Sequence, residues 1–380
     1  LRFSNGLPAH RTQKKALPGA GHGTVIPWWQ ELGEPFPGTG VVGVDFAILW
    51  LIDGPTLSVR TVVPGGAVSA PHLKLAFGVR LTSMRRNISP RSCIMGPRIS
   101  SLLESIISSD DRLRDQVAIA PELAGLCVDR ESPLDGEPLR DLAAIFRRNP
   151  CHCVADDETP VPASALPLGS PASGGPLLLE LLYRGGVWDP VAAADALRSY
   201  AELLLAPVLR LHFAYGITLE AHPQNAFLVV SGHGLPRRLL IRDLGGIRIH
   251  EPTLRARGLQ LQLHEDRLTV SDGWQVARRR LIHAVFQWHL GHLAWAVARH
   301  VPMEEARLWR EVRDVTAELL DQHRGELPAG RWDDERRLLL ESAWEAKSSI
   351  RMRLEDTQEE LFVSAPNPLC GDLAEDSTAV

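Results

Sequence analysis

The most constraining feature of the sequence is a predicted β-hairpin with polar side chains gathered at its ends. The apolar run 226–230 and residues 239–241 indicate two strands, because a glycine-containing turn at 231–234 separates them. An acid, an imidazole and two amides precede the first strand, and an aspartate follows the second. Since a hairpin returns the chain to its starting edge, we expect these side chains to lie close together. They are Glu220, His222, Gln224, Asn225 and Asp243.

These residue types suit a complex of a divalent metal ion with a nucleotide. Carboxylate and amide oxygens are hard ligands that Mg²⁺ prefers, and amides also orient phosphate or carboxylate groups. Five such groups rarely converge without a shared use, so the hairpin predicts a binding site. The alternative is a polar loop that is capped by ordinary turn residues.

Composition places the chain among globular proteins. Its 380 residues suffice for two domains or one large lobed domain, with 44% apolar and 23% charged residues. A net charge of −5 gives no electrostatic reason to expect a nucleic-acid partner. Five cysteines are an odd number for a disulfide framework, which favours a reducing, cytoplasmic compartment. We expect no membrane association, because the longest apolar run (46–52) is short and residues 1–15 lack a signal-peptide core.

One compositional change divides the chain. Residues 154–176 are rich in Pro, Ala, Ser and Gly, which predicts a flexible linker or insertion. We expect a β-rich part over 1–153, a helical part over 177–370 and a disordered acidic tail over 371–380. Periodicity predicts a strand over 73–80 and helices over 98–107, 191–215, 274–301, 303–325 and 332–354.

Candidate anion ligands lie in the β-rich part. Residues 57–61 alternate as in a strand, so Ser58 and Arg60 would share one face beside Thr61. A guanidinium flanked by hydroxyls is a good phosphate-binding set, and a solvent-facing edge strand is the alternative. Lys74 stands among apolar residues, where it is either a phosphate ligand or a residue that protects an edge strand from pairing.

Two further clusters allow more than one interpretation. Thr82, Ser83, Arg85 and Arg86 would bind a carboxylate or a triphosphate, or would form a solvated turn. Residues 151–153 read Cys-His-Cys, but no second Cys/His pair accompanies them, so a loop is favoured over a metal site. For His283, His289 and His292, packing or surface positions on a helix are favoured over metal binding.

Two protein families resemble the hairpin segment. In kinases of the aminoglycoside-phosphotransferase type, an acid, His-Pro and an Asn precede a metal-binding Asp. Glu220, His222-Pro223, Asn225 and Asp243 follow that order. No glycine-rich loop with a strand Lys and a helix Glu is evident upstream, and the acid is Glu where those kinases have Asp.

The second resemblance is closer and covers roughly residues 25–370. Glu220-Ala-His-Pro-Gln-Asn225 followed by Arg242-Asp-Leu-Gly-Gly246 resembles the IucA/IucC family of NRPS-independent siderophore synthetases, the aerobactin-synthetase type. The order of the other motifs agrees with that family. Ser58-x-Arg60-Thr61, Lys74-Leu75 and Thr82-Ser83-x-x-Arg86 precede the hairpin, and Ala346-Lys347, Arg351-Met-Arg353 and Asn367-Pro-Leu369 resemble the end of an FhuF-like C-terminal region.

The sequence departs from the family near its beginning. Residues 6–14 keep Gly, Pro, one His and the Lys of a glycine-rich phosphate segment, but lack its first His, its second Pro and its Arg. Residues 27–30 read Pro-Trp-Trp-Gln where the family has His-Pro-Trp-Gln. We therefore expect an N-terminally shortened or divergent member, and a non-catalytic remnant is a third alternative.

The resemblance implies an α+β fold shaped like a cupped hand, with a β-rich fingers part, a helical palm and no N-terminal lobe. It also implies ATP and Mg²⁺ as cofactors. The residues that it assigns to the triphosphate are Ser58, Arg60, Thr61, Lys74, His10 and Lys14. Those assigned to the nucleotide or Mg²⁺ are Gln224, Asn225 and Asp243, with Glu220 as a further metal ligand.

The remaining roles concern the substrates. The resemblance assigns the substrate carboxylate to Thr82, Ser83, Arg86 and His222, and catalysis to Arg86, His222 and Glu220. The implied reaction adenylates citrate or a citrate derivative and joins it to an amine or hydroxyl, releasing AMP and pyrophosphate. The implied partners are these small molecules and, in a homodimer, a second copy of the chain.

Overall fold

A computed structural model describes residues 2–3, 52–55, 57–58, 60–64, 70–81, 84–127, 142–183, 188–261, 270–271, 273–357 and 359–370. It combines helices and sheets, so the predicted α+β class is confirmed. Contacts divide the chain into two compact units. Unit 1 comprises residues 1–104, 120–153 and 261–266, and unit 2 comprises residues 105–119, 154–260 and 267–380.

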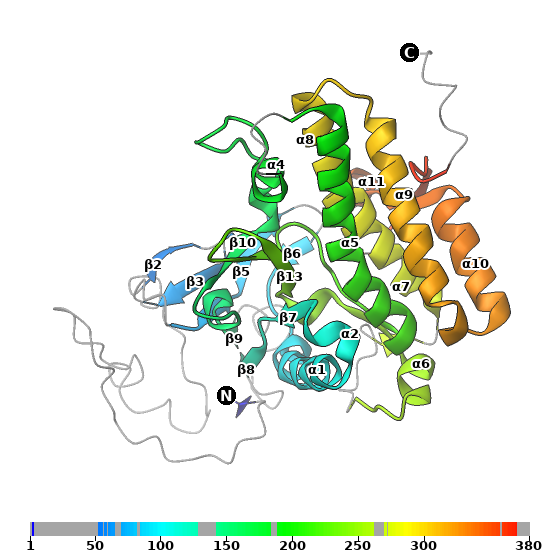
Figure 1. The fold of residues 1–380 in the computed structure, drawn as a ribbon. Helices are drawn as coiled ribbons and strands as arrows, with labels where there is room; N and C mark the ends of the chain where they lie inside the picture. The colour runs from blue at the N-terminus through cyan, green and yellow to red at the C-terminus, as the bar shows by residue number, and fades with distance from the viewer. Residues whose placement is uncertain are drawn as a thin grey trace, which may run out of the picture. The chain divides into compact units, whose positions relative to one another are not determined.

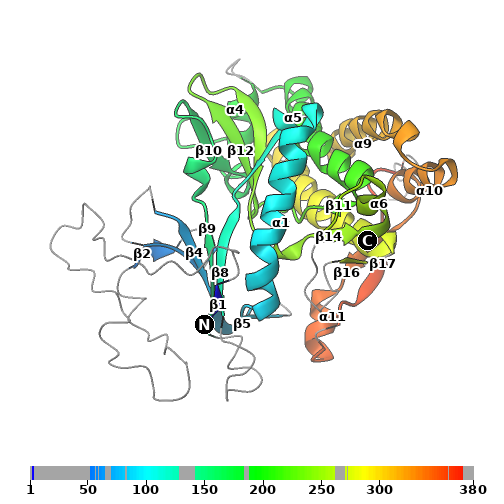
Figure 2. The same ribbon diagram turned by 90° about the horizontal axis from the view of Figure 1, so that it is seen from below.

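Unit 1 is built on a six-stranded sheet in the order β1-β8-β9-β4-β3-β2, and each neighbouring pair is antiparallel. Figure 2 shows β2, β4, β8 and β9 together in this sheet. The strands are β1 (Arg2–Phe3), β2 (Ile52–Pro55), β3 (Thr61–Pro64), β4 (His72–Leu75), β8 (Glu122–Cys127) and β9 (Ala143–Arg147). A hairpin of β5 (Phe77–Leu81) and β6 (Met84–Arg86) and the 3-10 helix η3 (Pro150–His152) also belong to this unit.

Helix α1 (Pro90–Ser109) begins in unit 1 and packs closely on β8. A Cβ atom at Gly125 would lie 2.1 Å from the carbonyl oxygen of Cys93, so this close approach requires glycine. The predicted helix over 98–107 lies within α1 and is confirmed. The predicted single strand over 73–80 is wrong, because the chain leaves the sheet at Ala76 and forms two strands, β4 and β5.

Unit 2 contains the predicted hairpin. Strands β12 (Ala226–Ser231) and β13 (Pro236–Ile241) pair in antiparallel register, with Ala226 opposite Ile241, which confirms the prediction. Every residue of β12 is buried, and β10 (Glu158–Pro162) pairs with its other edge. Strand β7 (Val117–Ile119) pairs in parallel with β13 and completes the sheet order β10-β12-β13-β7.

The stretch 154–176, for which a linker is expected, contains regular structure. Besides β10, it contains the 3-10 helix η4 (Ala163–Ala165). Unit 2 also takes in residues 105–119, which the predicted division assigns to the first part of the chain. Composition alone does not reveal either feature, because alternating Pro and Val residues can form an edge strand when a partner strand is nearby.

A long helix forms the centre of the helical part of unit 2 (Figure 1). Helix α5 (Pro190–Tyr215) confirms the predicted helix over 191–215. The carboxylate of Asp189 caps its N-terminus, and Gly216 ends it in a left-handed conformation at φ +69°. Helix α9 (Glu305–Gln322) packs along α5, and both expose a polar side.

Helix α9 confirms the predicted helix over 303–325, and the two remaining predicted helices are divided. Residues 274–301 form α7 (Trp274–Leu281), the π-helix η6 (Ile282–Leu290) and α8 (Gly291–His300). The predicted helix over 332–354 is wrong, since α10 (Ala329–Leu340) ends before β16 (Trp344–Lys347), which pairs with β17 (Phe362–Ala365). The smaller elements of unit 2 are α2 (Asp111–Arg114), α4 (Leu177–Leu182), β11 (Ile217–Thr218), η5 (Leu244–Gly246), β14 (Arg248–His250), α6 (Glu251–Ala256), β15 (Val270–Ser271), η7 (Arg324–Glu326) and α11 (Ser349–Leu354).

A buried charge network ties α5 to its neighbours. The guanidinium of Arg210 lies 2.9 Å from Asp110 Oδ2 and also pairs with Glu326, while the Tyr215 hydroxyl donates to Asp110 at 2.7 Å. Burial would raise the pKa of Asp110, but the hydrogen bonds from Tyr215 and Arg210 bring it below its usual value. Asp110 is therefore ionised, and the positive charge of Arg210 compensates its buried negative charge.

Replacing Arg210 by Met should lower the free energy of unfolding by about 3–5 kcal/mol, because it leaves the Asp110 carboxylate buried without its cation. Arg198 on the same helix is the matched control, since its pair with Glu318 is solvent-exposed. Arg198→Met should cost less than about 1 kcal/mol. Chemical denaturation of both variants measures the difference, and equal losses would contradict a special role for the buried network.

Candidate functional site

The segment 219–225 is held in place at the open end of the hairpin. Leu219 and Ala221 are fully buried, whereas Glu220 and His222 are partly exposed. The backbone N–H of Arg242 donates to the carbonyl of Asn225 at 2.9 Å, and its guanidinium donates to the carbonyl of Gln224 at 3.2 Å. The guanidinium also lies over the Phe227 ring at 5.4 Å. Buried Arg242 thus links the two ends of the hairpin through hydrogen bonds, a role that the sequence motif does not reveal.

A second contact fixes the segment from the π-helix η6. His289 is fully buried, with Nδ1 2.7 Å from the carbonyl of Ala221 and Nε2 2.7 Å from the hydroxyl of Tyr200. A carbonyl can only accept, so Nδ1 carries the proton and the Tyr200 hydroxyl donates to Nε2. Burial lowers the pKa of His289 to about 4, which keeps the ring neutral. The favoured packing interpretation of this histidine is confirmed.

Glu220 forms the central ion pair of the site. Its Oε1 lies 2.5 Å from Arg280 Nη1, and the two side chains are 22% and 10% exposed. Gly246 makes room for this carboxylate, because a Cβ atom there would lie 1.6 Å from Glu220 Oε2. The second residue of the Gly245-Gly246 pair is therefore glycine because a side chain there would collide with Glu220.

The other polar groups of the hairpin lie close to this ion pair. Burial lowers the pKa of His222. The nearby negative charges of Glu220 and Asp243 act to raise this pKa, and the positive charge of Arg280 acts to lower it. Asn225 is buried and donates through Nδ2 to the carbonyl of Glu220 at 3.3 Å. Asp243 adopts a left-handed backbone at φ +63°, which is uncommon for a residue with a side chain. The structure brings these groups together, whereas the Gln224 side chain is exposed.

Glu220, Asn225 and Asp243 do not form a complete metal site by themselves. Within the residues that the structure describes, no group of three or more His, Cys, Asp and Glu side chains could hold a metal ion. Asp243 and Asn225 nevertheless supply a carboxylate and an amide oxygen beside Glu220. That set fits Mg²⁺ in the way it usually binds, through one or two carboxylates together with the phosphates of a substrate.

In unit 1 the predicted anion ligands occupy different local structures from those expected. The prediction that Ser58 and Arg60 share a strand face is wrong, because β3 begins at Thr61 and the Thr61 N–H closes a turn onto the Ser58 carbonyl at 3.0 Å. Thr61 and Lys74 are paired across β3 and β4, and both are buried. Strand β4 lies inside the sheet, between β3 and β9, so protection of an edge strand does not explain Lys74.

The two candidate arginines of unit 1 are linked through the backbone. Arg60 Nη1 donates to the carbonyl of Arg86 at 2.7 Å and to that of Asn87 at 2.9 Å. Arg60 thereby fixes the end of β6, which carries Arg86. The remaining candidates, His10, Lys14, Thr82 and Ser83, lie outside the described residues, as does the tail 371–380.

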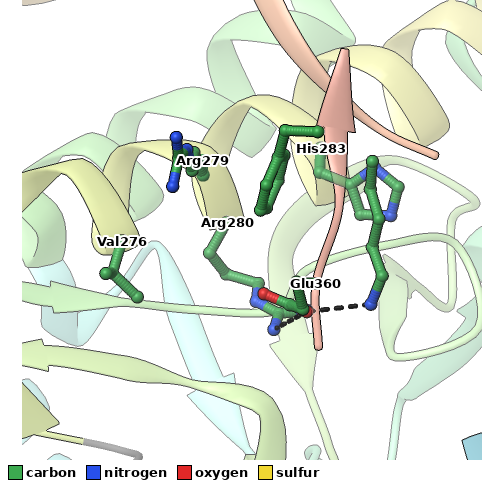
Figure 3. A pocket seen from close by; sticks show the side chains of 7 residues that line it. Val276, Arg279, Arg280, His283 and Glu360 are labelled. Carbon is green, nitrogen blue, oxygen red and sulfur yellow. Dashed lines mark hydrogen bonds and ion pairs between the residues drawn. The ribbon is translucent and has the colours of Figure 1, made fainter. Parts of the chain in front are cut away.

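Arg280, the partner of Glu220, lines a pocket in unit 2 (Figure 3). It measures about 350 Å³, including space that opens to solvent, and its lining includes Val276, Arg280 and His283 of helices α7 and η6. Lys347 and Glu360 also line it, and the Lys347 Nζ lies 2.8 Å from Glu360 Oε1. Arg280 Nη2 lies 3.4 Å from the same oxygen. Arg280 therefore bridges a carboxylate of the hairpin and a carboxylate of the pocket.

Sequence reasoning overlooked these pocket residues. Lys347 stands in a motif that resembles the IucA/IucC family, but the motif alone assigns it no role. Arg280 and Glu360 carry no local signal, since each has charged neighbours in a helix or loop where a solvated surface is the ordinary expectation.

Comparison with known families decides the ancestry of the chain. Residues 53–167 match the IucA / IucC family, and residues 197–362 match a family described as ferric iron reductase FhuF-like transporter. The order of these two matches is that of the motifs and the hairpin described above. The chain belongs to the IucA/IucC family.

Three curated relatives of this IucA/IucC member span the same region. It is 33% identical to the uncharacterized protein y4xN of Sinorhizobium fredii, over 83% of this chain and 51% of that one. It is 27% identical to D-ornithine–citrate ligase of Staphylococcus aureus, over 82% and 50%. It is 25% identical to a citryl-spermidine/3,4-dihydroxybenzoyl-citryl-spermidine:spermidine ligase of Bacillus anthracis, over 82% and 51%. The chain spans about half the length of the curated relatives it matches.

Solved structures share the fold of this family member. The petrobactin biosynthesis protein AsbB from Bacillus anthracis superposes with a TM-score of 0.69 at 24% identity, over 82% of this chain and 52% of that one. ATP-bound aerobactin synthetase IucA from Klebsiella pneumoniae gives a TM-score of 0.63 at 20% identity, over 82% and 54%. The predicted siderophore-synthetase architecture is thereby confirmed as a fold.

Two general features of the described residues complete the comparison with the sequence predictions. None of the helices that the structure describes is long and apolar enough to cross a membrane. No cysteine among the described residues forms a disulfide. The cytoplasmic location stays a prediction.

Gly246→Ala should destabilise unit 2 by roughly 1–3 kcal/mol, because the added methyl group displaces the Glu220 carboxylate and disrupts its pair with Arg280. Gly245→Ala is the matched control, since a Cβ atom there would lie 3.8 Å from Asp243 Oδ1, an ordinary contact. It should change stability by less than about 0.5 kcal/mol. Denaturant unfolding of both variants checks this, and a neutral Gly246→Ala would show that the carboxylate moves freely.

His289 should make the stability of the protein sensitive to mild acid. A histidine whose folded-state pKa is lowered contributes stability that is fully present above its unfolded pKa, near 6.5, and is lost as pH falls towards 4. Over this range the free energy of unfolding should fall by about 3 kcal/mol more in the native protein than in His289→Gln. Parallel pH slopes for the two proteins would show that His289 is not buried as described.

Proposed function

We propose that this chain forms part of an ATP-dependent siderophore synthetase, a ligase that joins a citrate-type carboxylate to an amine. The observation that carries the proposal is the convergence of Glu220, His222, Asn225 and Asp243 at the open end of the hairpin, in a chain of the IucA/IucC family. Names of the relatives support it, because two of them are citrate or citryl ligases. The ATP-bound state of one structural neighbour supports the nucleotide.

The proposed reaction has two steps. An oxygen of the substrate carboxylate attacks the α-phosphorus of ATP, the bond to pyrophosphate breaks, and an acyl-adenylate forms. The amine nitrogen then attacks the acyl carbon, the bond to AMP breaks, and the nitrogen loses a proton. Two anions must approach each other in the first step, so the protein has to supply positive charge where they meet.

Unit 1 carries cations and hydroxyl groups suited to binding anions. Thr61 and Lys74 are neighbours across two strands, and with Ser58 they form the proposed triphosphate set. Arg60 holds the backbone of Arg86 in place, which positions the Arg86 guanidinium for the substrate carboxylate. Thr82, Ser83, His10 and Lys14 keep the roles that the family resemblance assigns them. A guanidinium that is positioned in advance loses little entropy when it binds an anion.

The hairpin carries the groups for the metal and the proton. Asp243 and Asn225 would hold Mg²⁺, which when bound would offset the negative charge of the phosphates. Since burial lowers the pKa of His222, its ring is neutral near pH 7 and can accept the proton that the amine loses. Glu220 acts on His222 through its charge and is itself held by Arg280.

The test is to incubate the protein with ATP, Mg²⁺, citrate and hydroxylamine, a small nucleophile that traps acyl-adenylates. Release of pyrophosphate with formation of a hydroxamate is the expected result. Asp243→Asn should lower the rate at least about 10-fold, because it weakens the metal site. Asp314→Asn, on the exposed side of α9, is the control and should leave the rate unchanged.

Other products would point elsewhere. Formation of ADP with a phosphorylated acceptor would contradict the proposal and support a kinase of the aminoglycoside-phosphotransferase type. ATP binding without any turnover of citrate-type acids would identify a remnant of the family that no longer catalyses the reaction.

A further inference from the structure

The relatives differ in the amine that their names specify. One name contains D-ornithine, an amino acid with its own carboxylate, and another contains spermidine, a polyamine without one. Sequence identity is similar in the two comparisons and does not choose between them. The pocket beside Arg280 provides a physical basis for the choice.

Charges of both signs meet in this pocket. Lys347 and Arg280 both contact the carboxylate of Glu360, at 2.8 and 3.4 Å. Burial would raise the pKa of Glu360, but the hydrogen bond from Lys347 and the charges of Arg280, Lys347 and Arg248 bring it below its usual value. Glu360 is therefore ionised, and the floor of the pocket is an ordered arrangement of an anion between cations (Figure 3).

The acids around the pocket already have cationic partners. Glu220 pairs with Arg280, and Glu345 accepts from Arg279 Nε at 2.7 Å. Arg279 also lies over the Phe362 ring at 4.4 Å, so it forms a fixed wall. An additional cation would find the carboxylates of Glu220, Glu345 and Glu360 each already paired with a cation. It would also add positive charge beside Lys347 and Arg280.

We propose that this pocket binds the acceptor amine and selects one that carries its own carboxylate, an amino acid with a side-chain amine, over a polyamine. This inference rests on the proposed ligase function and names the substrate class of the same site. A zwitterionic head group fits an arrangement of alternating charges without adding net charge. Its carboxylate would accept from Lys347, and its ammonium would donate to the second oxygen of Glu360, since Lys347 and Arg280 both contact Oε1.

The rest of the pocket suits the remainder of such a molecule. Val276 and Phe362 provide apolar contact for a short methylene chain. Arg280 connects the pocket to Glu220, which is next to His222 in the hairpin site. The side-chain amine of the acceptor would thus be directed towards the group proposed to take its proton. A polyamine would place an ammonium where the carboxylate belongs, against Lys347.

The test uses pairs of amines that differ only in the carboxylate, lysine against cadaverine and ornithine against putrescine, each amino acid in both its D and L forms. Coupling to citrate is followed by the release of pyrophosphate. The better enantiomer of each amino acid should have a kcat/KM at least about 10-fold above that of its decarboxylated partner. Hydroxylamine, which has no head group, reports on the rest of the reaction.

Variants separate the charge of Lys347 from its structural role. Lys347→Gln should bring the preference for the amino acid close to unity. Lys347→Arg should retain the preference. Arg337→Gln, an exposed cation on α10, is the control and should alter none of these values.

The outcomes distinguish this inference from the proposed function. Titration calorimetry of ornithine and putrescine against the protein measures pocket affinity directly, even if no hydroxamate forms. Preferential binding of ornithine that Lys347→Gln abolishes supports the inference. Equal or stronger binding of putrescine, or a preference for ornithine that survives Lys347→Gln, overturns it, whatever the hydroxamate assay shows.

Discussion

The ion pair of Glu220 with Arg280 is the interaction on which the proposed site depends. One of its partners belongs to the segment before the hairpin and the other to helix α7, so the pair joins two separately formed pieces of unit 2. The pair also requires glycine at position 246, because a side chain there would occupy the space of the Glu220 carboxylate. Through Arg280 the same carboxylate is linked to Glu360 and Lys347, so the hairpin site and the pocket share one charge network.

Two buried side chains keep that network in register. Arg242 binds the carbonyls of the segment from the hairpin side, and His289 binds the carbonyl of Ala221 from the π-helix side. A π-helix widens the helical turn and often marks a functional position, which agrees with its place here. A neutral histidine serves this purpose because it can donate to the carbonyl and accept from Tyr200 without a buried charge.

Local sequence patterns predicted those elements that local forces determine. The hairpin of β12 and β13 follows from two apolar runs around a glycine turn, and α5 follows from its periodicity between Asp189 and Gly216. The predictions failed where a distant partner overrides the local preference. Residues 344–347 have a helical pattern but form a strand. They pair with β17 through backbone hydrogen bonds, and the Trp344 side chain is buried there. Residues 158–162 look like a linker but pair with β12.

By itself, the sequence determined the family, the α+β class and the convergence of Glu220, His222, Asn225 and Asp243, because these residues are close neighbours along one hairpin. Only the tertiary structure decided what surrounds them. Arg280 is 60 residues from Glu220 and 80 from Glu360, and no pattern along the chain announces a partner at such a distance. The Coulomb interaction depends on separation in space, and separation in space is set by how helices and strands pack.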